Sequence, residues 1–203
     1  MSTSGLQSKT REVPDRKTEV FRAAAELMVE KGYGGTSIND IAQAVGMTKA
    51  GLYHHISSKQ DMLFRILNHA LDELERIVST PVRLIEDPER RLRQLMRLQI
   101  LGSVKHGLAF TVLFLEKKHL APAQQMEINE RIKEHHALIR ETLRELAENG
   151  RLRSLDVNIA TMHIMNAMTG VARWKHHDFA SDAEHLIQET IAYTMAALLK
   201  PAR

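Results

Sequence analysis

Apolar residues recur every three to four positions along most of the 203-residue chain, which is the spacing of amphipathic α-helices. Runs that alternate apolar β-branched residues with polar ones, as strands do, are missing from the sequence. The chain is therefore predicted to be all-α. The expected helices cover about residues 15–31, a short pair within 36–55, 58–79, a stretch from 87, 107–118, 122–149, 156–175 and 181–200.

Glycine, proline and capping residues mark the expected ends of several helices. Gly32 follows the first periodic stretch, where a left-handed residue commonly ends a helix. Pro81 is expected to break the long helix at 58–79, because proline lacks the amide hydrogen that a helix needs. Asp87 and Pro88 form a cap followed by proline at the first helical position, so a new helix is predicted there.

The short helical pair within 36–55 has the signals of a sharp turn between two helices. Gly46 can adopt the left-handed conformation that ends the first of them. Thr48 can cap the second through its hydroxyl group, and Leu52 is the expected core anchor of that helix. This arrangement predicts a helix-turn-helix, which lays its second helix in the major groove of DNA.

The charge pattern around this pair also favours DNA binding. No Asp or Glu occurs from Ile41 to Gln60, and carboxylates there would repel phosphates. The residues expected to contact DNA are Ser37, Asn39, Thr48, Lys49, Ala50, Gly51, Tyr53, His54, His55 and Lys59. Of these, Ser37, Asn39 and Lys59 are expected to hold the DNA backbone. The alternative is an ordinary helical corner whose lysines are merely solvated.

A long string of residues resembles the TetR family of bacterial transcriptional regulators. Its matching segments are 23–27, 31–33, Thr36 and Ser37, Ile41 and Ala42, Val45 and Gly46, 51–55, Lys59, and Met62 and Leu63. The resemblance covers about residues 15–65. One departure is Ile56, where the family usually has an aromatic residue; it remains apolar, so its packing role is expected to persist.

The resemblance implies two domains. We expect a three-helix helix-turn-helix DNA-binding domain at 15–75 and a larger helical ligand-binding and dimerisation domain at 76–203. The polar stretch 1–14 is expected to be a disordered arm. Its basic residues Lys9 and Arg11, together with Arg16 and Lys17, either follow the DNA backbone or form a simple solvated tail.

Composition excludes several other kinds of protein. The chain has no cysteine, so disulfides and thiolate chemistry are ruled out, and its formal net charge of +3 is weak evidence for any partner. The N-terminal stretch 1–14 has no apolar core region, so it is not a signal peptide. The longest apolar run, 108–115, is too short to span a membrane. We expect a cytoplasmic protein with no membrane partner.

The last two predicted helices carry more apolar surface than one small core requires. A single helix-turn-helix supplies about one half-site of base contacts, so a second copy of the chain is expected. TetR-type proteins dimerise through these helices, which implies a homodimer on a double-stranded operator. The alternative is that both helices are buried within the monomer.

Three segments of the C-terminal half, 114–122, 148–150 and 168–174, carry a second resemblance. Over about residues 105–198 the chain resembles TetR regulators of fatty acid, phenylacetate and sterol degradation. That resemblance implies a repressor whose small-molecule effector is an acyl-CoA thioester. The residues expected to bind it are Met96, Phe110, Phe114, Met165, Met168, Arg173 and Trp174. A methionine stripe is more often part of an ordinary core than of a pocket. A multidrug-responsive repressor, sensing aromatic or cationic compounds, is the alternative.

Neither metal binding nor catalysis is expected. Three histidine pairs are adjacent in the sequence, at 54–55, 135–136 and 176–177. Neighbouring residues on a helix point about 100° apart, so such pairs chelate a metal poorly. No glycine-rich phosphate loop or serine elbow is present, so we expect no cofactor, no catalytic residue and no enzymatic activity.

Overall fold

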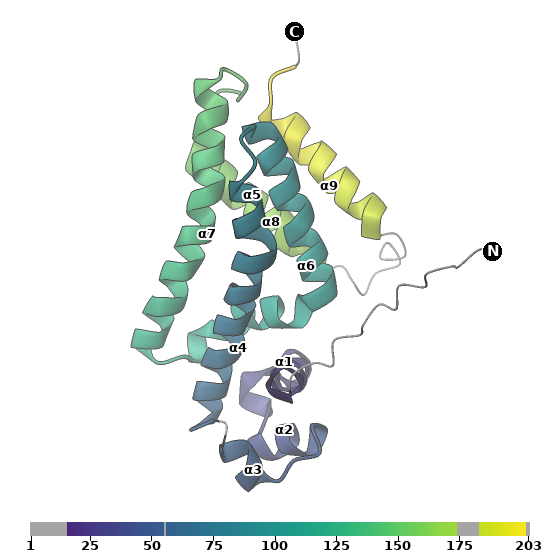
Figure 1. Ribbon diagram of the computed structural model, residues 1–203, viewed down its shortest axis with the longest axis vertical. Helices are drawn as coiled ribbons and strands as arrows, with labels where there is room; N and C mark the ends of the chain where they lie inside the picture. The colour runs from purple at the N-terminus through teal and green to yellow at the C-terminus, as the bar shows by residue number, and fades with distance from the viewer. Residues whose placement is uncertain (1–15, 55, 174–182, 202–203) are drawn as a thin grey trace, which may run out of the picture.

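The computed structural model describes residues 16–54, 56–173 and 183–201, and the regular elements in that part of the chain are helices (Figure 1). The all-α prediction is therefore confirmed. In chain order the elements are α1 (Arg16–Gly35), α2 (Ile38–Ala44), α3 (Lys49–Tyr53), α4 (Lys59–Leu74), the π-helical turn η1 (Glu75–Ser79), α5 (Thr80–Arg83), α6 (Pro88–Glu116), the 3₁₀ turn η2 (Lys117–His119), α7 (Pro122–Glu148), α8 (Val157–Arg173) and α9 (Ala183–Leu198).

The first three helices and the start of α4 enclose a small apolar core at the lower end of Figure 1. Met28 of α1, Ile41 of α2, Leu52 of α3 and Met62 of α4 are all fully buried in it. Gly32 has a φ of 73° and ends the regular part of α1, as predicted. Because one residue from each helix meets in this core, the four helices are held as one unit.

The long helix does not end at Pro81, contrary to the sequence-based prediction. Instead, α4 continues through η1 into α5. The amide of Thr80 donates to the carbonyl oxygen of Glu75, five residues back, and this wider turn accommodates the missing amide of the proline. Val82 is fully buried, so packing of α5 also favours the extra turn.

The break expected before residue 107 is absent, and α6 is one continuous helix. Its beginning is as predicted, because the Asp87 carboxylate accepts a hydrogen bond of 2.7 Å from the amide of Arg90. Gly102 lies within the helix, and a Cβ atom there would come within 3.0 Å of the Ile77 side chain. The glycine therefore allows η1 to approach α6 closely, which explains a poor helix former inside a long helix.

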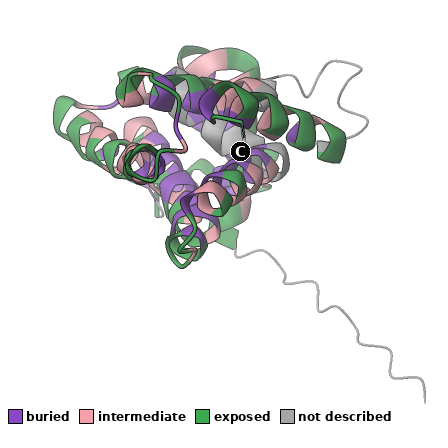
Figure 2. Ribbon diagram, turned by 90° about the horizontal axis from the view of Figure 1, so that it is seen from above, coloured by how far each residue is buried: buried purple, intermediate pink, exposed green. Residues whose placement is uncertain are grey.

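The C-terminal helices form the upper body of the molecule. In Figure 1, α4, α6 and α7 run along its long axis, while α8 packs on α6 and α7, and α9 packs on α6 and α8. Seen from above, buried residues lie on the sides of the helices that face one another (Figure 2). Hydrogen bonds of 2.9 Å join Arg153 to Leu198 and Lys200 to Arg151, so the end of α9 is attached to the segment that precedes α8.

The helices predicted at 122–149 and 156–175 are present as α7 and α8 over their described lengths. Asp156 begins α8 by accepting hydrogen bonds from the amides of Asn158 and Ile159. The predicted arm at 1–14 and the first residues of the helix predicted at 181–200 lie outside the described residues.

Candidate nucleic-acid interface

The turn between α2 and α3 has the geometry that the sequence predicts. Gly46 has a φ of 64°, and the amide of Met47 donates to the carbonyl oxygen of Ala42 at 2.9 Å. Ala42 is buried, and so is Leu52 on α3. The small side chain at one contact and the large one at the other fix α3 across α2.

Two hydroxyl groups cap the helices of this pair. The amide of Asp40 donates to the Ser37 hydroxyl at 3.1 Å, and the amide of Ser37 donates to the Asp40 carboxylate at 2.8 Å. These hydrogen bonds hold the pKa of Asp40 below its usual value. The Thr48 hydroxyl accepts from the amide of Gly51 at 3.0 Å. Each hydroxyl is used as an acceptor here and keeps its own hydrogen for an outside partner.

The burial of Leu52 leaves the rest of α3 facing outwards. Tyr53 is 45% exposed, a high value for a large aromatic side chain. The other predicted DNA contacts that are exposed are Ser37, Asn39, Thr48, Lys49, Ala50 and His54, and Gly51 is half-buried. His55 lies outside the described residues. The exposed residues 48–50, 53 and 54 are here called the ridge of α3, and none of them carries a carboxylate.

Lys59 differs from the other predicted contacts. Its ammonium group donates to the carbonyl oxygens of Tyr33 at 2.6 Å and Thr36 at 2.8 Å, and lies 4.2 Å from the centre of the Tyr33 ring. Two of its three hydrogens are thus used within the protein. Local capping signals do not reveal these contacts, because their partners lie 23 and 26 residues earlier.

The structure adds one cationic residue that the sequence reasoning missed. Arg65 lines a hollow of about 240 Å³ together with Arg16, Lys17 and His54. The Arg65 guanidinium also donates to the Asp61 carboxylate at 2.9 Å. In the sequence, Arg65 looks like one half of an ordinary helical ion pair, so only the fold reveals that it lies beside α1.

The predicted effector residues divide into two groups. Met96, Met165 and Met168 are buried in the C-terminal domain, on the packed helices α6 and α8. The side chains of the remaining candidates, Phe110, Phe114, Arg173 and Trp174, lie outside the described part of the chain. Their role as effector contacts remains a prediction.

A buried polar cluster in the same domain was not identified from the sequence. Within it, His135 of α7 lies 3.2 Å from the Ser79 hydroxyl of η1 and 2.8 Å from the Gln99 amide oxygen of α6. Burial, together with the nearby charges of His136 and Arg83, lowers the pKa of His135 to about 4. The imidazole is therefore neutral at neutral pH, and both of its nitrogens have a partner. In the sequence, its position next to His136 marks His135 only as a possible metal ligand.

His135 and His136 are the one adjacent histidine pair that lies fully within the described residues. The ring centres of His135 and His136 are 6.5 Å apart and the rings are tilted by 57°. Within the described residues, no group of three or more His, Cys, Asp or Glu side chains is arranged to hold a metal ion.

The outer faces of α8 and α9 carry large apolar side chains. Ile159 is 56% exposed, Met162 64% and Tyr193 82%. Ile159 and Tyr193 also line a mainly apolar hollow of about 560 Å³ between the two helices. A lone exposed apolar residue is ordinary, but several on adjacent helices form a continuous patch.

A buried core that presents a second short helix outwards, after a left-handed glycine, defines a helix-turn-helix DNA-binding protein. Residues 20–66 match the family model described as "Bacterial regulatory proteins, tetR family". Residues 86–198 match the model described as "Tetracyclin repressor-like, C-terminal domain", which covers more than half of the chain. The chain therefore belongs to the TetR family, and it is a TetR-type transcriptional regulator with an N-terminal DNA-binding domain. This family consists of transcriptional regulators rather than enzymes.

Individual relatives agree with this assignment. The transcriptional repressor KstR2 of Mycobacterium tuberculosis is 27% identical over 192 residues, which cover 93% of this chain and 96% of that protein. Its solved structure, described as a ketosteroid transcriptional regulator, superimposes with a TM-score of 0.85 at 26% identity, covering 94% of this chain and 98% of that one. AibR in complex with isovaleryl coenzyme A and operator DNA superimposes with a TM-score of 0.82 at 29% identity, covering 88% and 97%.

These relatives match the subgroup of acyl-CoA-responsive TetR regulators that the sequence resembles. None of the described helices is long and apolar enough to cross a membrane.

Proposed function

We propose that the chain represses transcription in the cytoplasm as a homodimer bound to a palindromic operator, with α3 of each copy in the major groove. The observation that carries this proposal is the outward ridge of α3, held in place by the buried Leu52. Lys49 and His54 supply cationic or polar contacts to phosphates, while Tyr53 and Ala50 are available to base edges.

The proposed dimer forms through α8 and α9 of two copies. Two identical patches facing each other would cover Ile159, Met162 and Tyr193 in an isologous interface. Pairing would also hold two α3 helices at the fixed spacing that a palindromic site requires.

Selection of binding sequences from random duplex oligonucleotides tests the DNA-binding part. An enriched palindrome with half-sites about one helical turn apart is the expected result. A monomeric protein without any preferred sequence would contradict the proposal.

The dimer part is tested with the double variant Met162→Lys and Tyr193→Lys. It is expected to sediment as a monomer and to lose operator affinity, because each lysine would be buried without a partner in the interface. Met126→Lys is a matched control, since Met126 is 69% exposed but lies on α7. That control is expected to remain dimeric.

We propose further that a hydrophobic effector, an acyl-CoA thioester, releases the repressor from its operator. Isovaleryl coenzyme A occurs in the AibR complex, which supports this class of ligand. The buried Met96, Met165 and Met168 provide flexible apolar walls that can adapt to an acyl chain.

Fluorescence anisotropy with labelled operator tests the effector. Isovaleryl coenzyme A and longer acyl-CoAs are expected to lower operator affinity by about 5–150-fold, the usual range of coupling between two sites. Cationic aromatic dyes are the comparison series. Release by the dyes alone would favour a multidrug-responsive repressor instead, and release by neither series would contradict an acyl-CoA effector.

A further inference from the structure

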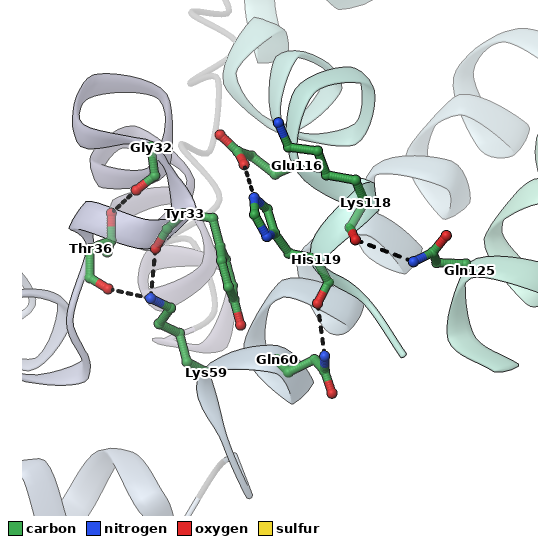
Figure 3. A network of polar contacts seen from close by, with 9 residues as sticks. All are labelled: Gly32, Tyr33, Thr36, Lys59, Gln60, Glu116, Lys118, His119 and Gln125. Atoms are coloured by element: carbon green, nitrogen blue, oxygen red, sulfur yellow. Dashed lines mark hydrogen bonds and ion pairs between the residues drawn. The ribbon is translucent and has the colours of Figure 1, made fainter. Parts of the chain in front are cut away.

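The two domains meet at the corner between α6 and α7, where η2 lies against the DNA-binding domain (Figure 3). The His119 ring stacks on the Tyr33 ring, with ring centres 4.7 Å apart and planes 16° from parallel. The Gln60 side chain at the start of α4 donates to the carbonyl oxygen of His119 at 2.7 Å. Both contacts join a residue of η2 to an element of the DNA-binding domain.

On the DNA-binding side, Tyr33 is held by Lys59. Figure 3 shows the Tyr33 ring between His119 and the Lys59 side chain. The same ammonium group bonds the carbonyl oxygens of Tyr33 and Thr36, and Thr36 directly precedes Ser37, which caps α2. A chain of direct contacts therefore runs from η2 to the first residue of the helix-turn-helix.

On the effector side, His119 is tied to the end of α6. Its Nε2 atom lies 3.3 Å from the carboxylate of Glu116, the last residue of α6, and Glu116 is itself buried. Because His119 contacts both Glu116 and the Tyr33 ring, a shift of the end of α6 must displace Tyr33 or break its contact with His119.

We propose that His119, Tyr33 and Lys59, here named the corner stack, couple the effector-binding domain to the orientation of α2 and α3. This inference rests on the proposed function and identifies how that function is regulated. Two other routes compete with the corner stack. Helix α1 packs directly on α6, and α4, which links the two domains, is clasped by Arg131 through Asn68 and Asp72. The corner stack differs because it reaches the start of α2 through single side chains and meets α4 only at its first residue, Lys59.

Coupling between two sites is reciprocal, so operator binding must stabilise the corner stack if the stack carries the effector signal. Hydrogen–deuterium exchange of the full-length protein, with and without the selected operator duplex, measures this. In the parent protein, operator is expected to slow exchange of the amides of 117–120 by about fivefold or more. In His119→Ala the slowing is expected to fall below about twofold, while α2 and α3 remain protected.

Three further variants separate coupling from simple loosening of the turn. His119→Phe keeps a stacking ring and is expected to restore the slowing. Tyr33→Leu removes the stack from the other domain and should repeat the His119→Ala result. Gln125→Ala is the matched control, because Gln125 bonds the carbonyl oxygens of Lys118 and Leu120 without reaching the DNA-binding domain. It is expected to leave the operator-dependent slowing intact.

The outcomes distinguish this inference from the proposed function. Slowing that persists in both His119→Ala and Tyr33→Leu, or that is absent from the operator-bound parent, would overturn the corner stack. If no duplex is preferred in the selection, DNA recognition itself fails and the inference fails with it.

Discussion

The interiors of the two domains are built differently. In the described part of the DNA-binding domain, Thr36 is the buried polar residue, and its hydroxyl lies within 3.0 Å of the carbonyl oxygens of Leu27 and Gly32. The C-terminal domain buries many more polar side chains. They are Ser79, Gln99, Ser103, Glu116, His135, Thr142 and Thr161.

This difference separates a domain held by apolar packing from one whose interior also depends on paired polar groups. An apolar core has one best packing, and it keeps α3 at a fixed angle to the rest of its domain. Buried polar groups are costly unless they are paired, so their stability depends on where several helices lie at once. His135 bonds groups from η1 and α6 while lying on α7, and a movement of any of these elements changes that balance.

Leu52→Ala is the largest expected perturbation of the DNA-binding domain. Because Leu52 is fully buried, its truncation should lower the free energy of unfolding by about 2–5 kcal/mol. Urea unfolding measures this, with Tyr53→Ala as the exposed neighbour that should cost less than about 1 kcal/mol. Equal costs for the two variants would show that α3 is not anchored through its core residue.

Acid should destabilise the C-terminal domain through His135. Its pKa falls from 6.5 to about 4 on folding, so the unfolded chain binds the proton more readily. Stability is complete above pH about 6.5 and is lost as the pH falls towards 4, by a total on the order of 3 kcal/mol. Chemical unfolding at several pH values measures the slope.

Two substitutions identify the histidine that is responsible. His135→Gln should flatten the pH dependence between about 6.5 and 4. His54→Gln, at an exposed position after α3 and away from the proposed dimer interface, should leave it unchanged. A pH dependence that survives His135→Gln would assign the effect to other groups.

Thr48→Ala tests the N-terminal cap of α3 in the DNA-binding domain. Loss of the hydroxyl removes the hydrogen bond to the Gly51 amide, and caps of this kind contribute about 1 kcal/mol. Thermal unfolding gives the cost. Thr48→Ser keeps the acceptor and should recover most of it, whereas no difference between serine and alanine would mean that the cap is not used in solution.

Lys49→Ala should have the smallest effect on stability, within about 0.5 kcal/mol, because the side chain is exposed. Its expected effect is on the operator. Affinity should weaken, and the slope of log affinity against log salt should decrease by about 1 for each phosphate that the lysine no longer neutralises. Fluorescence anisotropy at several salt concentrations measures both, and an unchanged slope would exclude Lys49 from binding a phosphate.

The DNA-binding domain could be predicted in detail because the sequence signals for its turn and caps are local. The left-handed Gly46, the Thr48 cap and the buried Leu52 all lie within seven residues of sequence. Lys59 shows the limit of this reasoning, since its partners are set by the crossing of α1 and α4. Lys59 was expected to hold the DNA backbone, whereas two of its hydrogen bonds stay within the protein.

The C-terminal domain was predicted less well because its structure depends on packing between helices that are distant in the sequence. Pro81 remained inside a helix because η1 widens and Val82 is buried, and neither is visible as a local pattern. The polar cluster joins residues 36 and 56 positions apart, so sequence spacing carried no signal for it. The prediction of an all-α chain, with a helix-turn-helix domain followed by a larger helical domain, needed only periodicity and family resemblance, and it is confirmed.

The π turn η1 has a consequence for the rotational phase of everything that follows it. A π turn holds one residue more than an α turn, and that residue rotates the next side chains by about 100° around the helix axis. Ser79 faces α7 and bonds His135 in this phase. A chain shortened by one residue in η1 would keep its helix but point Ser79 in another direction. The one extra residue of the π turn therefore determines that the Ser79 hydroxyl contacts α7.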